Sequence, residues 1–220
     1  MLENGGGNMN RQSANGSEKS TQGFRTRLSR WLKDPLFPYP KMLCAELCAM
    51  GVKACMAERG RPEEKTAKAS LGIIDITGSP IRWINVRLVG LGDNSEDFVD
   101  YGVPDSRALP PIEIQSKWVR TFPVFGRIID VRWEVVSIID VRWRDWRDTG
   151  TMIMQRLSSD ETIRNSIMDT CEVTVRAVPE SGCWLIIQRR YTWNSPLLKG
   201  HQWRCYEKIA EHLLATPILP

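Results

Sequence analysis

The clearest pattern along the chain is an alternation of apolar and polar residues over 128–143, where the letters IIDVRW occur twice, ten residues apart. Because successive side chains of a strand point to opposite faces, this even spacing places both copies on the same face. In a helix the second copy would be turned by roughly 80° from the first, and the apolar stripe would break. The alternation therefore predicts a strand. A strand of 16 residues is longer than usual, so we expect a bend or bulge near Val136 and Ser137.

Shorter segments with strand-like patterns predict the rest of a sheet. A Gly-Ser-Pro turn at 78–80 joins the first two, and a Pro-Glu-Ser-Gly turn at 179–182 joins the last two as a hairpin. The expected strands cover residues 71–77, 81–89, 112–124, 171–178 and 183–192. Residues 90–111 contain several Gly, Pro and Asn and a run of acids, which is typical of a long polar loop.

Three segments of the same part of the chain are predicted to be helices. Residues 41–58 repeat apolar side chains at helical spacing, residues 158–168 open with the capping sequence Ser-Ser-Asp-Glu, and a last helix starts at 195–196 and ends before Pro217. Together with the strands, these helices predict an α+β domain over 41–220. Its twisted, mostly antiparallel sheet would carry two or three packed helices.

The first 40 residues differ from this domain in composition. Residues 1–22 are rich in Gly, Asn, Ser and charge and almost without aliphatic side chains, so we expect a disordered tail. Up to Lys33 the chain holds six basic and two acidic residues, and the remaining 187 hold 24 of each. The whole net charge of +4 therefore lies in this arm, which favours phosphate backbones or acidic lipid headgroups as partners. The opening residues lack the apolar run of a secretory leader.

Residues 23–40 contain two candidate interaction sites. The first is a basic amphipathic stretch whose apolar side is bordered by Arg, as in helices that lie at the headgroup boundary of a membrane. A short helix docked on its own domain is the alternative. The candidate membrane-binding residues are Phe24, Arg25, Arg27, Leu28, Arg30, Trp31, Leu32 and Lys33.

The second candidate site is a proline-rich segment, which should be extended and exposed. It ends in YPKML at 39–43, which matches the YPx(n)L form of the late motifs by which viral structural proteins recruit budding machinery. In such a motif Pro40 would pre-order the backbone, and Tyr39 and Leu43 would be the anchors for an apolar groove. A plain linker that leads into a helix is the alternative.

The sequence carries no recognisable catalytic or metal-binding motif. No zinc-protease, Walker or nucleophile-elbow pattern occurs, and the one-turn spacing of His201 and Cys205 is more typical of packing than of a dyad. Cys44, Cys48 and Cys55 lack the paired C-x-x-C spacing of a zinc site and are interpreted as buried apolar residues. We therefore expect no catalytic residue, no metal, no cofactor and no small-molecule substrate, and a binding or structural protein instead of an enzyme.

Basic residues adjoin most of the nine Trp, as in Arg82-Trp83 and Arg132-Trp133. In strands this places Trp in the core and Arg on the opposite face, where it could bind RNA by backbone contacts and stacking. A viral accessory or RNA-binding protein that acts as a host antagonist through this face is thus the alternative function. The equal numbers of acids and bases after Lys33 favour an ordinary solvated surface instead.

The order of elements resembles that of rhabdovirus matrix proteins, best over residues 110–193. Pro110-Pro111 precedes a strand, Gly126 opens the long β pair, a helix follows at 158–168, and the closing hairpin carries the turn SGCW at 181–184. The basic arm and the proline-rich segment before the domain agree in kind with that family. Two features differ, since FPYPKML stands where the family has a PPxY motif and residues 195–220 add a helix that vesiculovirus members lack.

This resemblance implies a viral matrix protein that self-associates beneath the envelope, binds anionic membrane, condenses the viral ribonucleoprotein and promotes budding. The partners that it implies are anionic membrane lipids, the viral nucleocapsid, other copies of the chain and host budding machinery. The expected locations are the virion beneath its envelope, the host cytoplasm, the inner face of host membranes and the nucleus. Membrane binding would be electrostatic and multivalent.

Overall fold

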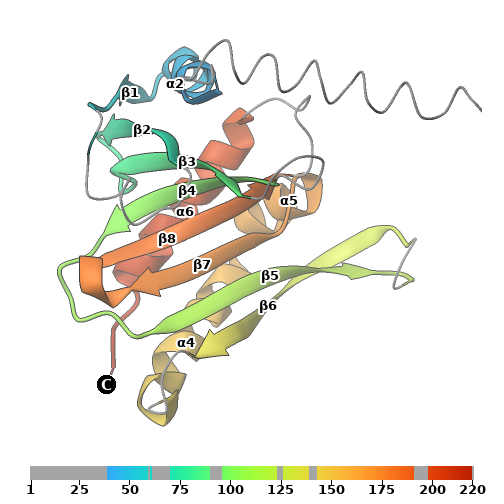
Figure 1. The fold of residues 1–220 in the computed structure, drawn as a ribbon. Coiled ribbons are helices and arrows are strands. Elements are labelled where there is room, and N and C mark those ends of the chain that lie inside the picture. Colours follow the sequence, from blue (N-terminus) through green and yellow to red (C-terminus); the bar gives the residue numbers. More distant parts are fainter. Residues whose placement is uncertain are drawn as a thin grey trace, which may run out of the picture.

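The computed structural model describes residues 39–58, 60, 70–89, 96–122, 126–138, 143–190 and 198–219. Within these residues an eight-stranded antiparallel sheet is combined with helices, which confirms the α+β class (Figure 1). The expected disordered tail at 1–22 and the amphipathic residues 24–33 lie outside the described residues.

The sheet has the strand order β1-β2-β3-β4-β8-β7-β5-β6. The strands are β1 Lys53–Met56, β2 Ser70–Thr77, β3 Trp83–Val89, β4 Glu96–Pro104, β5 Ile112–Arg120, β6 Ile128–Ile138, β7 Val173–Val178 and β8 Cys183–Arg190. The first four form a meander, and the chain between β4 and β5 then passes the place that the β7–β8 hairpin later fills. As a result, β1 and β6 are the two edges of the sheet.

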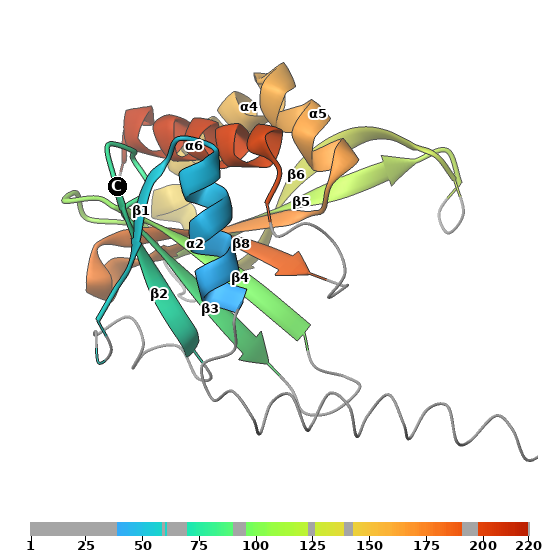
Figure 2. The ribbon, with the colours of Figure 1, turned by 90° about the horizontal axis from the view of Figure 1, so that it is seen from above.

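Four α-helices occur in the described part of the chain, one more than the upper number expected. They are α2 Tyr39–Ala49, α4 Trp143–Ser159, α5 Glu161–Asp169 and α6 Gly200–Ala215. Figure 2 shows α4, α5 and α6 on the same side of the sheet, while α2 packs against β1 and β2 at the meander end. The core lies between the sheet and α6, where the Tyr101 ring of β4 meets Tyr206 with 4.4 Å between ring centroids.

The helix predicted over 41–58 is wrong in its second half. The helix α2 ends at Ala49, and Gly51 then takes a φ of +83°, a left-handed conformation that glycine adopts without a Cβ clash. The next residues turn back and pair with β2 as β1, so Ala54 and Cys55 belong to a strand. The apolar spacing therefore continued beyond the helix into a strand whose Cys55 and Met56 are exposed.

Two other segments differ from the sequence prediction. The region expected to be a polar loop, 90–111, contains β4, which pairs with both β3 and β8 in the middle of the sheet. The second IIDVRW copy does not continue the long strand, since β6 ends at Ile138 and Trp143 already begins α4. The residues between them, 139–142, lie outside the described residues.

The bulge expected near Val136 and Ser137 is confirmed. Glu113 of β5 pairs with Ser137, whereas its neighbour Ile114 pairs with Val135, so Val136 is the extra residue on β6. A second register shift at the other end of the strand leaves out Ile129.

Candidate functional site

The late motif predicted at Tyr39, Pro40 and Leu43 is wrong as an exposed peptide. These residues form the first turns of α2, and all three are buried, with Tyr39 only 5% exposed. Tyr39 and Leu43 belong to the hydrophobic core that α2 shares with the inner face of β2. A partner could reach their side chains only if this end of the domain unfolded.

The structure contradicts the interpretation of two cysteines as buried, and it buries the cysteine of the His201–Cys205 pair. Cys48 and Cys55 are exposed, so their interpretation as buried residues is wrong. Cys205 is buried, and burial raises the pKa of its thiol to about 12, which keeps it protonated and non-nucleophilic beside the exposed His201. Within the described residues, no group of three His, Cys, Asp or Glu could hold a metal ion.

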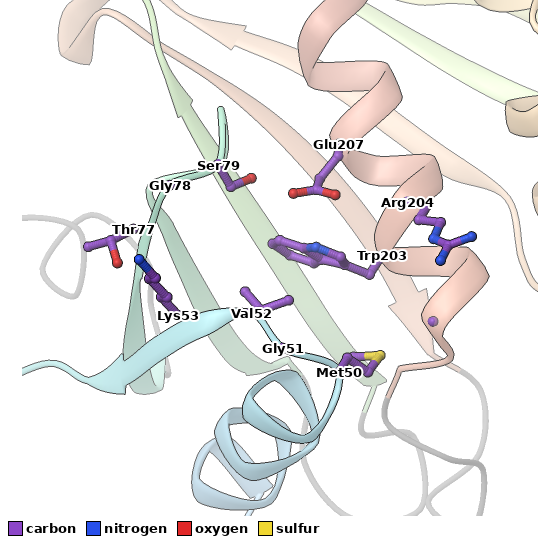
Figure 3. A pocket seen from close by; sticks show the side chains of 11 residues that line it. Met50, Gly51, Val52, Lys53, Thr77, Gly78, Ser79, Trp203, Arg204 and Glu207 are labelled. Carbon is purple, nitrogen blue, oxygen red and sulfur yellow. The ribbon is translucent and has the colours of Figure 1, made fainter.

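A cavity of about 550 Å³ lies between α6 and the turns that precede β1 and follow β2. Figure 3 shows Lys53 and Glu207 on different walls of this cavity, with the Trp203 ring between them. The Ser79 hydroxyl oxygen in its wall accepts the Ile81 amide at 3.3 Å. The described lining residues contain neither His nor Cys, so the cavity does not offer the usual partners of a catalytic dyad.

The most distinctive surface feature is the hairpin of β5 and β6, which extends beyond the rest of the sheet (Figure 1). The strand β5 pairs with β7 only through Glu113–Gln115, and the Ser116 hydroxyl then takes the place of strand pairing by accepting the Val173 amide at 2.7 Å. Beyond Ser116, β5 is paired with β6 alone. We call residues 117–122 and 126–132 the hairpin arm.

The root of the hairpin arm is fixed to the domain through Trp118. Its indole Nε1 donates to the Ile167 carbonyl of α5 at 3.0 Å, and its backbone amide donates to Glu172 Oε1 at 3.0 Å. Because one bond reaches α5 and the other the residue before β7, together they fix the root of the hairpin to the domain. The Arg120 guanidinium lies over the Trp118 ring, 5.1 Å from its centroid.

The tip of the hairpin arm presents an apolar side chain held by backbone bonds. The Thr121 amide donates to the Arg127 carbonyl, and the Gly126 amide donates to the Phe122 carbonyl, both at 3.1 Å. Arg120 Nη1 adds a bond to the Gly126 carbonyl at 3.2 Å. Phe122 is 71% exposed and Ile129 on β6 is 54% exposed. These two exposed apolar side chains make the hairpin arm a candidate interaction surface.

Positive charge surrounds these apolar residues. The hairpin arm contains four basic side chains and one acidic side chain, which gives a net charge of +3. They are Lys117, Arg120, Arg127 and Arg132, with Asp130 as the acid. Lys117 and Arg132 occupy directly opposite positions of the two strands, so two like charges lie close together on one face of the hairpin. The hairpin arm therefore has the composition of a membrane-interface or polyanion-binding element.

The outer face of the sheet, where an RNA-binding surface was the alternative, has its charges largely paired. Arg87 forms an ion pair with Asp100 and its guanidinium lies over Phe98, and Arg176 donates to Glu113 at 2.6 Å. The expectation of a core filled by Trp holds for Trp133, Trp184 and Trp203. Paired cations offer little free charge to a phosphate backbone, so the hairpin arm is the better candidate.

Gly126 fits the tip in a way that no other residue can. A Cβ at this position would lie 2.1 Å from the Phe122 amide nitrogen and 2.8 Å from its carbonyl oxygen. We expect Gly126→Ala to open the turn, which would speed hydrogen exchange of the Thr121 and Gly126-position amides by about tenfold or more while amides of β7 and β8 stay protected. Gly200→Ala is the control, since the nearest atom there, Met50 Sδ, is 3.8 Å away. Unchanged exchange at the tip would contradict this view.

Comparisons with known proteins add no identification. No family model, no curated protein and no solved structure matches this chain. In the described part of the chain, no helix is both long and apolar enough to cross a bilayer.

Proposed function

We propose that this chain is a matrix-type structural protein that binds the surface of anionic membranes and assembles there into a layer. The observation that supports this most directly is Phe122, 71% exposed at the tip of the hairpin arm between cationic residues. The sequence adds a second basic element in residues 24–33. Viral origin, nucleocapsid condensation and budding come from the resemblance to rhabdovirus matrix proteins and are part of the proposal.

The energies expected for the hairpin arm are small for a single molecule. Burying Phe122 among acyl chains contributes roughly 1.5–3 kcal/mol, and each basic residue near an anionic leaflet adds about 1 kcal/mol. One Phe with two cations therefore yields roughly 4 kcal/mol, which corresponds to a dissociation constant near 1 mM. Binding of this strength needs several copies or a second basic element, so layer formation and membrane binding support one another.

Co-sedimentation of the full chain with lipid vesicles tests this function. We expect binding to phosphatidylserine-containing vesicles and little binding to pure phosphatidylcholine. Phe122→Ser should weaken it by about tenfold or more, and Lys117→Gln with Arg127→Gln by roughly 30-fold. Among the described residues, the side-chain bond to the tip comes from Arg120 and from neither of these cations, so the hairpin should stay folded.

Two control variants match these substitutions in chemistry. Leu219→Ser removes an exposed apolar side chain far along the chain, and Arg82→Gln with Arg156→Gln removes two exposed cations outside the hairpin arm. Both should bind vesicles like the wild type. Equal loss in the two-cation control would mean that binding follows the net charge of the chain, and equal loss with Leu219→Ser would mean that it follows any exposed apolar side chain. Binding that survives Phe122→Ser, together with salt-sensitive RNA binding lost with Lys117 and Arg127, would favour the RNA-binding alternative.

A further inference from the structure

The outer edge of β6 carries a second interaction surface. This strand is the last of the sheet, and Figure 1 shows no described element beside its outer edge in the half near the hairpin tip. Its inner side is held in place, since Val131 and Trp133 are buried under α4 and α5. An edge strand presents a row of backbone donors and acceptors that another strand can pair with.

The two register shifts of β6 leave a regular stretch between them. From Asp130 to Val135 each residue pairs with β5 in an unbroken register, whereas Ile129 and Val136 are extra residues at either end. Bulges often protect the edges of sheets, and here they limit the pairing-competent edge to six residues. Such a short segment suits weak and reversible association.

The charge pattern along this stretch is complementary to that of the same stretch in a second, antiparallel copy. The exposed residues Asp130, Arg132 and Glu134 alternate as acid, base and acid on one face of the strand. Within the described residues, none of the three forms an ion pair. If two such strands lie antiparallel, Arg132 of each copy faces either Asp130 or Glu134 of the other, which makes two opposite-charge pairs. The register that places Arg132 opposite Arg132 brings like charges together and is disfavoured.

We propose that a second copy of this chain adds its β6 antiparallel to β6 of the first and joins the two sheets into one. The contact is isologous, so it closes a two-fold dimer without using the Phe122 tip. As the source of the dimeric unit of a membrane-bound layer, this contact rests on the proposed function. As strand pairing, it is measurable without lipid.

Sedimentation velocity of the full chain at increasing concentration, up to about 200 µM, tests the contact. We expect a concentration-dependent dimer for the wild type. Arg132→Glu turns the pattern into three acids, and the double variant Asp130→Lys with Glu134→Lys turns it into three bases. Each alone should raise the dimer dissociation constant by about tenfold or more, since every aligned pair becomes repulsive.

Mixing the two variants is the decisive arm of the experiment. The acidic and basic edges complement each other, so the mixture should form a heterodimer at least as readily as the wild type forms a homodimer. Arg204→Glu, an exposed charge reversal on α6, is the control and should dimerise normally. Thermal unfolding of each variant checks whether the fold is retained.

Three results would overturn the contact: a wild type that stays monomeric throughout, variants that dimerise like the wild type, or a mixture that stays monomeric. Its failure is separable from failure of the proposed function. If the chain stays monomeric but its vesicle binding still depends on Phe122, only the strand pairing is refuted. If the chain dimerises but does not bind vesicles, only the membrane role is refuted.

Discussion

Replacing Arg107 by Met is expected to destabilise the domain by about 3–5 kcal/mol, the cost of leaving a buried charge without its partner. The Arg107 guanidinium makes a bidentate contact with Asp105, whose side chain is only 3% exposed. It also donates to the carbonyls of Leu213 and Thr216 at the end of α6, at 3.0 Å and 2.6 Å. Chemical denaturation of the full chain measures the loss.

Measuring the stability loss of Arg107→Met at low pH separates the loss of the charge pair from the loss of packing. Burial raises the pKa of Asp105, but bonds from the Arg107 side chain and backbone and from Trp184 Nε1 outweigh it, so its pKa lies below the usual range. A carboxylate with a lowered pKa stabilises the fold above its unfolded pKa of about 4, and this contribution disappears as the pH falls through the folded value. The penalty of Arg107→Met should therefore shrink at low pH.

Arg176→Met is the matched control for this prediction. The Arg176 side chain is 43% exposed in its pair with Glu113, so its loss should cost less than about 1 kcal/mol at any pH. A penalty for Arg107→Met that is equally small, or that does not change with pH, would contradict the role assigned to the buried pair.

The contacts of Arg107 belong to a part of the fold that sequence patterns did not predict. Asp105 and Arg107 lie in 90–111, which reads as a polar loop because it combines acids with Gly and Pro. In the structure this segment contains the central strand β4, and Asp105 and Arg107 follow it and tie Trp184 of β8 to the end of α6. Strand pairing on both sides of β4 overrides the low strand propensity of Gly102 and Pro104. Long-range pairing of this kind leaves little local signal.

The alternation rule succeeded where local pattern and packing agree. Val131 and Trp133 are buried and Arg132 and Glu134 exposed, as the alternation predicts, and the bulge lies at Val136. The second copy of the same hexapeptide fails the rule, because Trp143 begins a helix that covers the sheet. The Trp that ends each copy thus lies in a strand in the first and in a helix in the second, where its tertiary neighbours differ.

The candidate site was predicted less well than the fold. Tyr39 and Leu43 could equally anchor a linear motif or a helix, since both uses need apolar residues three or four positions apart, and the structure shows the helix. The hairpin tip was read as part of a strand. Its signal was present in the sequence, because Phe122 stands between Arg120 and Arg127 in a stretch that also contains Gly126.

Gly102→Ala is the second substitution with a large expected effect, about 3 kcal/mol of lost stability. Gly102 of β4 pairs with Trp83 of β3, and the indole lies flat against it, so that an added Cβ would sit 2.1 Å from Trp83 Cε2. The indole would have to leave its place or the strands would have to separate.

Trp83→Ala removes the obstacle and so provides the test of that cause. In the Trp83→Ala background, Gly102→Ala should cost little, because the Cβ then enters space that the indole occupied. Denaturant midpoints of the four proteins of this double-mutant cycle yield the coupling between the two positions. A cost that is the same in both backgrounds would show that backbone conformation at Gly102, and not the indole, excludes the side chain. Because this contact lies at β3 and β4, far along the sheet from the hairpin arm, vesicle binding per folded molecule should stay unchanged, which separates what holds the domain together from what we propose it uses to bind.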